Sequence, residues 1–183
     1  LQVTVLWRHH PGAATPAAGG MLTPGAEATS LEPELIELAK ASCAIYPGFV
    51  TRVQQAGQLP CGYREEGTMI VALHQDHVAE LEHLATHQRQ LGLSSQWLTR
   101  TEVREREPNV SPRQVGALWI SGDHQVNPIA LQGALGRAAR RLGVCFIECT
   151  KKPHIAHSPS GVEEVAAVTS QGHVHCRAPN VVV

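Results

Sequence analysis

Several histidines of this 183-residue chain are candidate metal ligands by their residue type and spacing. His74 with His77, and His83 with His87, have spacings of three and four, which can place two metal ligands together on a helix. Leu84 stands where the H-E-x-x-H zinc motif requires Glu, and neither pair has a partner to complete a site. Solvated surface histidines are therefore the preferred interpretation, and no metal site is predicted.

A second group, residues 121–124, reads Ser-Gly-Asp-His and has the side-chain types of a hydrolase triad. Adjacent residues cannot orient as a triad, because its members must converge from separate segments. Asp123 is better explained as a turn former ahead of Asn127. The charged run at 102–107 alternates in sign, which is typical of an exposed helix. No catalytic residue is predicted.

A run of small residues at 15–24 follows a short β-branched strand at 3–6. Backbone with such small side chains can approach a bulky ligand closely. The same composition suits a turn that only lets two elements pack together, so the run alone leaves both interpretations open. The loop around it, residues 8–30, is too long for a mere connection, and loops of that length are usually functional or disordered.

Composition excludes several classes of protein. Apolar residues make up 43% of the chain and charged residues 17%, as in an ordinary globular protein of one domain or two small ones. The net charge of −1 argues against nucleic acid as a partner, because phosphate neutralisation needs a concentrated basic patch. No run of 18 apolar residues predicts a membrane span, and no N-terminal pattern predicts export. Five irregularly spaced cysteines are typical of reduced thiols, so a cytoplasmic location is expected.

Periodicity predicts an α/β frame with a small α+β unit. A helix beginning near Pro33 should pack one apolar face inward, and Pro47 should either kink it or divide it in two. Asn127-Pro128 is the clearest helix start, because Asn caps free amides and Pro suits the first turn. Gly143 should end that helix. The expected inward face of the first helix comprises Leu35, Leu38, Ser42, Ile45, Phe49 and Val53.

The remaining elements are predicted from the same rules. Asp76 should cap another helix, and residues 101–107 should form a short charged one. An apolar strand at 181–183 should return the chain to the sheet that residues 3–6 open. Strands are also expected at 68–73, 96–98, 115–120, 145–149, 155–157, 165–169 and 174–176.

Motifs in order along nearly the whole chain match one known family. The most specific are Ala-Gly-Gly-Met-Leu at 18–22 and Asp-x-Gln-Val-Asn-Pro at 123–128, and Gly-Tyr-Arg at 62–64 also matches. With these motifs the chain resembles the D-amino-acid-oxidase type of flavoproteins, in particular the glycine oxidases of thiamine biosynthesis. The resemblance implies FAD as cofactor and oxidative deamination of glycine or a similar small amine, with hydride transfer to flavin and oxygen as acceptor. The alternatives are a sarcosine oxidase, a D-amino-acid dehydrogenase or a non-catalytic α+β module, and a homo-oligomer stays open.

In that family a substrate domain is inserted into a Rossmann-like FAD-binding domain. The resemblance implies a partial Rossmann-like domain made of residues 1–58 and 126–183, interrupted at 59–125 by a small substrate domain with a mixed or antiparallel sheet. The G-x-G-x-x-G unit is expected to precede Leu1, and the arginine and tyrosine that hold the substrate carboxylate are expected to follow Val183. The chain is thus expected to be an internal fragment that is inactive alone.

The resemblance also assigns cofactor contacts. Ala14 and Thr15 would face the pyrophosphate. Gly19, Gly20 and Met21 would lie along the ribityl chain and the flavin, where small residues admit the ring and backbone amides serve its polar edges.

Three further contacts would lie at the adenosine. Lys152 would offer its backbone there. Trp7, followed by Arg8, stands where the superfamily often places a ribose-binding Glu. Trp7 would stack on or flank the adenine, but an indole cannot accept hydrogen bonds from the ribose hydroxyls as a carboxylate does.

Overall fold

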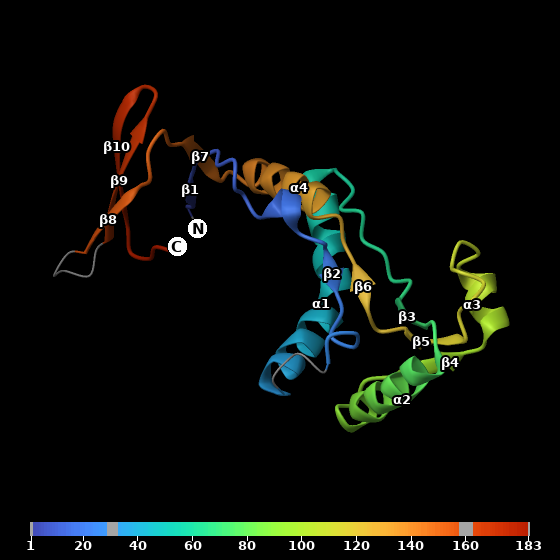
Figure 1. The fold of residues 1–183 in the computed structure, drawn as a ribbon. Coiled ribbons are helices and arrows are strands. Elements are labelled where there is room, and N and C mark those ends of the chain that lie inside the picture. The colour runs from blue at the N-terminus through green and yellow to red at the C-terminus, as the bar shows by residue number, and fades with distance from the viewer. Residues whose placement is uncertain (1, 29–32, 158–162, 183) are drawn as a thin grey trace.

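The computed structural model describes residues 2–28, 33–157 and 163–182. Figure 1 shows an arched chain with a three-stranded antiparallel sheet at one end and two packed helices in its middle. A second three-stranded sheet, with two more helices, forms the other end. The first sheet consists of β8 (His154–His157), β9 (Glu163–Thr169) and β10 (Gly172–Ala178). Within the described residues, no helix is long and apolar enough to cross a membrane.

A parallel strand pair supports the expected α/β frame. The strand β1 (Thr4–Trp7) pairs with β7 (Cys145–Glu148), so that Trp7 lies opposite Glu148. The helix α4 (Pro128–Arg141) directly precedes β7, as in an α/β unit. The last predicted strand was wrong for residues 181 and 182, which lie in no strand, and residue 183 lies outside the described residues. The β9–β10 ladder ends at Ala178, and Pro179 has no N–H with which to extend it.

The sheet at the other end confirms the predicted α+β unit. It has the antiparallel order β3 (Thr68–Ala72), β5 (Gly116–Ile120) and β4 (Gln96–Leu98). The helix α2 (Gln75–Gln90) packs on this sheet, burying Leu81 with Leu118. The short helix α3 (Arg100–Arg106) adds Val103 to a second small core.

The helix boundaries follow local chemistry, with one correction. Asn127 caps α4 by accepting a hydrogen bond from Ala130 N at 3.0 Å, and Gly143, at φ +86°, follows its C-terminal end, as predicted. The predicted cap of α2 was wrong: His74 is the N-cap residue, and Asp76 lies in the first turn. Its carboxylate there still complements the helix dipole.

The helix α1 (Pro33–Gly57) continues through Pro47 as one element. Val50 and Val53 are buried in a core shared with Ala134 of α4, and this packing holds the segment after Pro47 helical. The predicted inward face is wrong for the first half of the helix: Leu35, Leu38 and Ile45 are 48%, 65% and 69% exposed. The core that α1 shares with α4 covers only its second half.

Candidate functional site

The small-residue loop folds into defined structure. A 3₁₀ turn, η1 (Thr15–Ala17), is closed by hydrogen bonds from Ala17 N to Ala14 O at 3.0 Å and from Ala18 N to Thr15 O at 3.3 Å. This turn lies against α4. The loop then passes through Gly19 and Gly20 into the short strand β2 (Met21–Leu22).

The two glycines meet different surroundings. Gly20 has φ +72°, and its carbonyl accepts a hydrogen bond from Val126 N at 2.9 Å. A Cβ on Gly20 would overlap the carbonyl oxygen of Val126, so the fold itself requires glycine here. A Cβ on Gly19 would meet nothing nearer than Met21 Cγ at 3.8 Å. The backbone at Gly19 is therefore open to a ligand, and Met21 beside it is 64% exposed.

Three distant segments meet beside these glycines. The strand β6 (His124–Gln125) pairs antiparallel with β2, so that Met21 lies opposite Gln125 and Leu22 opposite His124. On its other edge, Gln125 exchanges two backbone hydrogen bonds with Arg64, at 2.9 and 3.0 Å. We call residues 20–22, 61–64 and 124–127 the β-junction. Sequence reasoning missed it, because two-residue strands carry no periodicity.

Tyr63 and His124 form a side-chain pair inside the β-junction. Tyr63 Oη lies 2.6 Å from His124 Nδ1 and donates to Glu65 Oε1 at 3.1 Å. The single hydroxyl of Tyr63 thus contacts both His124 and Glu65. Burial, followed by the hydrogen bond to Glu65, raises the pKa of Tyr63 above its ordinary value of 10.0.

We expect Tyr63→Phe to lower the free energy of unfolding by about 1–2 kcal/mol, because it removes both hydrogen bonds and leaves the ring packing in place. Urea unfolding followed by circular dichroism would measure the change. Tyr46→Phe is the matched control. The ring centroids of Tyr46 and Tyr63 lie 5.7 Å apart, so both belong to one aromatic cluster, but Tyr46 is not part of the pair with His124. An equal loss in both variants would contradict the assignment.

Asp123 does more than form a turn. It is 1% exposed and accepts hydrogen bonds from Gly25 N at 2.8 Å and Ala26 N at 3.0 Å. Burial raises the pKa of this carboxyl, and the two amides oppose the shift in part. Since its carboxylate is taken up by backbone amides and His124 bonds Tyr63, these residues do not form a triad with Ser121. The sequence offered no signal for this role beyond the Asp-x-Gln-Val-Asn-Pro motif.

The three residues predicted to contact the adenosine lie at one end of the β1–β7 strand pair. Trp7 ends β1, is 39% exposed, and accepts a hydrogen bond from Cys149 N at 2.7 Å through its carbonyl. Arg8 follows it and is exposed, and Lys152 is exposed just beyond β7. Because β1 and β7 run parallel, the last residue of β1, Trp7, and the residues that follow the two strands, Arg8 and Lys152, lie toward the same end of the pair. The eight residues thus divide into this group and the loop group at 14–21.

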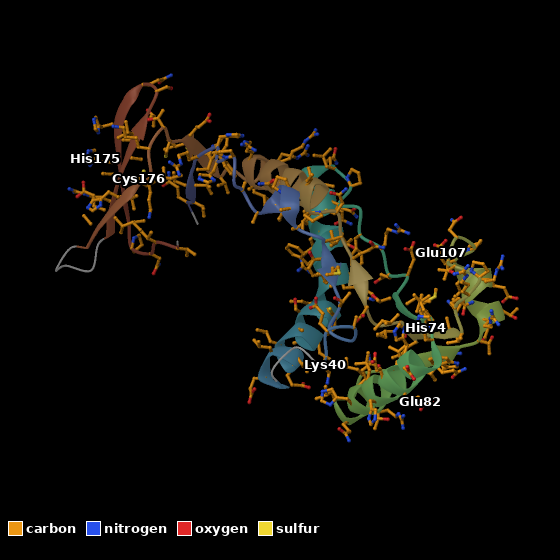
Figure 2. The ribbon with its side chains drawn as sticks, viewed as in Figure 1. Lys40, His74, Glu82, Glu107, His175 and Cys176 are labelled. Atoms are coloured by element: carbon orange, nitrogen blue, oxygen red, sulfur yellow. The ribbon has the colours of Figure 1, made fainter. Side chains whose placement is uncertain are left out.

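The first histidine pair lies at the start of α2 and Lys40 lies on α1, so these residues belong to neither group (Figure 2). His74 and His77 have ring centroids 5.3 Å apart, and His77 Nδ1 accepts a hydrogen bond from Leu73 N at 3.3 Å. Lys40 of α1 donates to the carbonyl of Leu91 after α2, at 2.8 Å. Among the described residues, no three His, Cys, Asp or Glu side chains are grouped to hold a metal ion.

A groove of 670 Å³ lies between α2 and the β4–β5 edge of its sheet. Its wall is apolar where Val78, Leu81 and Leu118 line it, and Glu82 and Arg89 add opposite charges. None of the eight predicted cofactor residues lines it. The groove is therefore separate from the β-junction.

Comparison with known proteins gives a consistent result. Residues 1–183 match the family model described as DAO, FAD dependent oxidoreductase. A glycine oxidase of Geobacillus kaustophilus (strain HTA426) is 33% identical over 149 residues, which cover 81% of this chain and 39% of the relative. The bifunctional protein ThiO/ThiG of Synechocystis sp. is 31% identical over 172 residues, covering 94% of this chain and 24% of that protein. The crystal structure of glycine oxidase from Geobacillus kaustophilus superposes with a TM-score of 0.78 at 30% identity, over 94% of this chain and 46% of the other. The chain spans less than half the length of these relatives.

Proposed function

Because the chain belongs to the DAO family of FAD-dependent oxidoreductases, we propose that it forms part of an enzyme that oxidises glycine or a similarly small amine. A glycine oxidase and a ThiO/ThiG protein among its relatives support this substrate class and a place in thiamine biosynthesis. The observation that carries the proposal is the loop at 18–22, whose Gly19 and Met21 are open to a ligand while Gly20 is fixed on β6.

The residues of the loop fit a flavin cofactor. Gly19 offers backbone without a side chain over it, and exposed Met21 offers an apolar surface on which a flat ring can lie. FAD, when bound, accepts a hydride from the amine and is reoxidised by oxygen. The part of this chain is to hold and orient the cofactor. Ala14 and Thr15 would serve its pyrophosphate, and residues 19–21 its ribityl chain and flavin.

The adenosine half would lie near the ends of β1 and β7. Exposed Trp7 would stack on or flank the adenine, with Arg8 next to it in the chain and the backbone of Lys152, four positions beyond the end of β7, also near the adenosine. The same proposal divides the chain into a cofactor domain, residues 1–58 and 126–183, and a substrate domain, residues 59–125. The parallel pair β1–β7 in the first and the antiparallel sheet β3–β5–β4 in the second support this division.

We also propose a cytoplasmic location. All five cysteines, Cys43, Cys61, Cys145, Cys149 and Cys176, are free thiols, as is usual in a reducing compartment.

Glycine-dependent turnover tests the proposed function. The protein expressed from its complete reading frame should purify with the yellow absorption bands of a flavin and should release hydrogen peroxide when glycine is added in air. Sarcosine and a series of D-amino acids serve as comparison substrates. A protein that is colourless and takes up no added FAD would reject the proposal, and a flavoprotein that oxidises only the comparison substrates would reject glycine.

A further inference from the structure

The β-junction has two faces of different chemistry. Residues directly opposite one another in antiparallel pairs carry their side chains on the same face. Gln125 lies opposite both Met21 and Arg64, so these three side chains share one face. The neighbours of these residues along each segment, Leu22, His124 and Tyr63, share the other.

Side-chain contacts agree with this alternation. On the inner face, Leu22 and Tyr63 pack against the buried core, and Tyr63 bonds Glu65 two positions on. On the outer face, Arg64 Nη2 forms an ion pair with Glu66 Oε2 at 2.6 Å, again two positions on. The side chain of Arg64 is 59% exposed. The outer face is therefore a row of Met21, Gln125 and Arg64, flanked by Glu66.

The row combines an apolar side chain, Met21, with a cationic one, Arg64. Such a face suits a small amino acid that lies beside an apolar ring and presents its carboxylate to the guanidinium. Neighbouring strands lie about 4.8 Å apart, so the backbone of Arg64 starts roughly 10 Å from the backbone of Met21, on the same face. The guanidinium has five N–H donors in a plane that matches a carboxylate, and one ion pair leaves several of them open. Arg64 is held at its backbone by both hydrogen bonds to Gln125, which fixes where its side chain starts.

We propose that Arg64 binds the carboxylate of the amine substrate and that Glu66 is a positioning residue that orients the guanidinium. The inference rests on the proposed function, because Met21 beside the flavin makes this face the substrate side. Arg64 acts in addition to the carboxylate-holding residues that the family resemblance implies outside this chain. It selects amines that carry a carboxylate over those that do not.

Steady-state kinetics of the complete protein with glycine test this role. Arg64→Gln should raise the KM for glycine about tenfold or more while kcat changes less than about twofold, because a charge-assisted hydrogen bond to the bound substrate is lost. The inhibition constant of acetate, which offers only a carboxylate, should rise in parallel. Arg64→Lys should restore part of the affinity, and Glu66→Gln should raise KM less than Arg64→Gln. If Arg64 had a purely structural role, its replacement would not raise both the KM for glycine and the inhibition constant of acetate while kcat stayed constant.

Arg104→Gln on α3 is the matched control, since Arg104 lies outside the β-junction, and it should leave both constants unchanged. Suppose that the unaltered protein oxidises glycine and that Arg64→Gln changes neither the KM for glycine nor the inhibition constant of acetate. That result would overturn this inference and leave the proposed function standing. A protein that carries no flavin or does not oxidise glycine would overturn the proposed function and this inference with it.

Discussion

Gly20→Ala should lower the free energy of unfolding by about 3 kcal/mol or more and disrupt the β-junction. Alanine at φ +72° adopts the left-handed region at a cost of about 1–2 kcal/mol. In addition, its Cβ would overlap the carbonyl oxygen of Val126 and crowd Pro128, so β6 and the start of α4 would have to move. Urea unfolding would measure the loss. Because residues 19–21 are proposed to lie along the flavin, the variant should also purify without FAD.

Gly19→Ala is the matched control for this variant. The added methyl group would meet only Met21 Cγ at 3.8 Å, so the free energy of unfolding should stay within about 0.5 kcal/mol of the unaltered protein. The same methyl group would lie where the cofactor is proposed to approach, so FAD affinity should fall about tenfold in a fully folded protein. Unchanged FAD binding in Gly19→Ala would contradict the proposed cofactor contact. A Gly20→Ala variant of unaltered stability would contradict the rigid junction.

Asp123→Ala should lower the free energy of unfolding by about 2–4 kcal/mol, because it leaves the amides of Gly25 and Ala26 without their acceptor. Thermal or urea unfolding would show the loss. Asp76→Ala is the matched control, since Asp76 lies exposed in the first turn of α2 and should cost only about 0.3–1 kcal/mol through the helix dipole. Equal losses in the two variants would contradict the role of Asp123.

The pH dependence of Asp123 has a defined sign. Burial raises the pKa of its carboxyl above the ordinary value of 3.8, so the folded protein binds this proton more tightly than the unfolded chain. Its contribution to stability is therefore fully present below the unfolded pKa and is lost as pH rises through the folded pKa. The difference in unfolding free energy between the unaltered protein and Asp123→Asn should shrink over that window. A difference that grows with pH would show a lowered pKa instead.

Elements with strong local signals could be predicted from the sequence. Asn127 caps α4, Gly143 follows its end, and the three strands of the β3–β5–β4 sheet lie at the three short segments where strands are predicted. Asp76 was assigned as a cap because its residue type suits one, yet the N-cap of α2 lies two positions earlier, at His74. Local chemistry thus located the elements more reliably than their first residues.

Features set by distant partners could not be predicted. The requirement for glycine at position 20 comes from the carbonyl of Val126, more than a hundred positions away. The exposure of Leu35, Leu38 and Ile45 on α1 depends on which neighbours cover them, and periodicity shows only that an apolar face exists. The outer row of the β-junction depends on the register of two-residue pairings. The loop itself was identified by its small residues, but its separate roles for Gly19 and Gly20 required β6.

The long span closed by Asp123 also sets an order of events during synthesis. Gly25 and Asp123 are 98 positions apart, so the loop cannot be fastened until both have emerged from the ribosome. At 5–20 residues per second, the segment after β2 waits roughly 5–20 s for its partner. The glycine-rich loop is exposed to proteases throughout that interval. Cofactor capture would therefore be a late step of biogenesis, and slowing translation between codons 26 and 123 should lower the yield of folded protein.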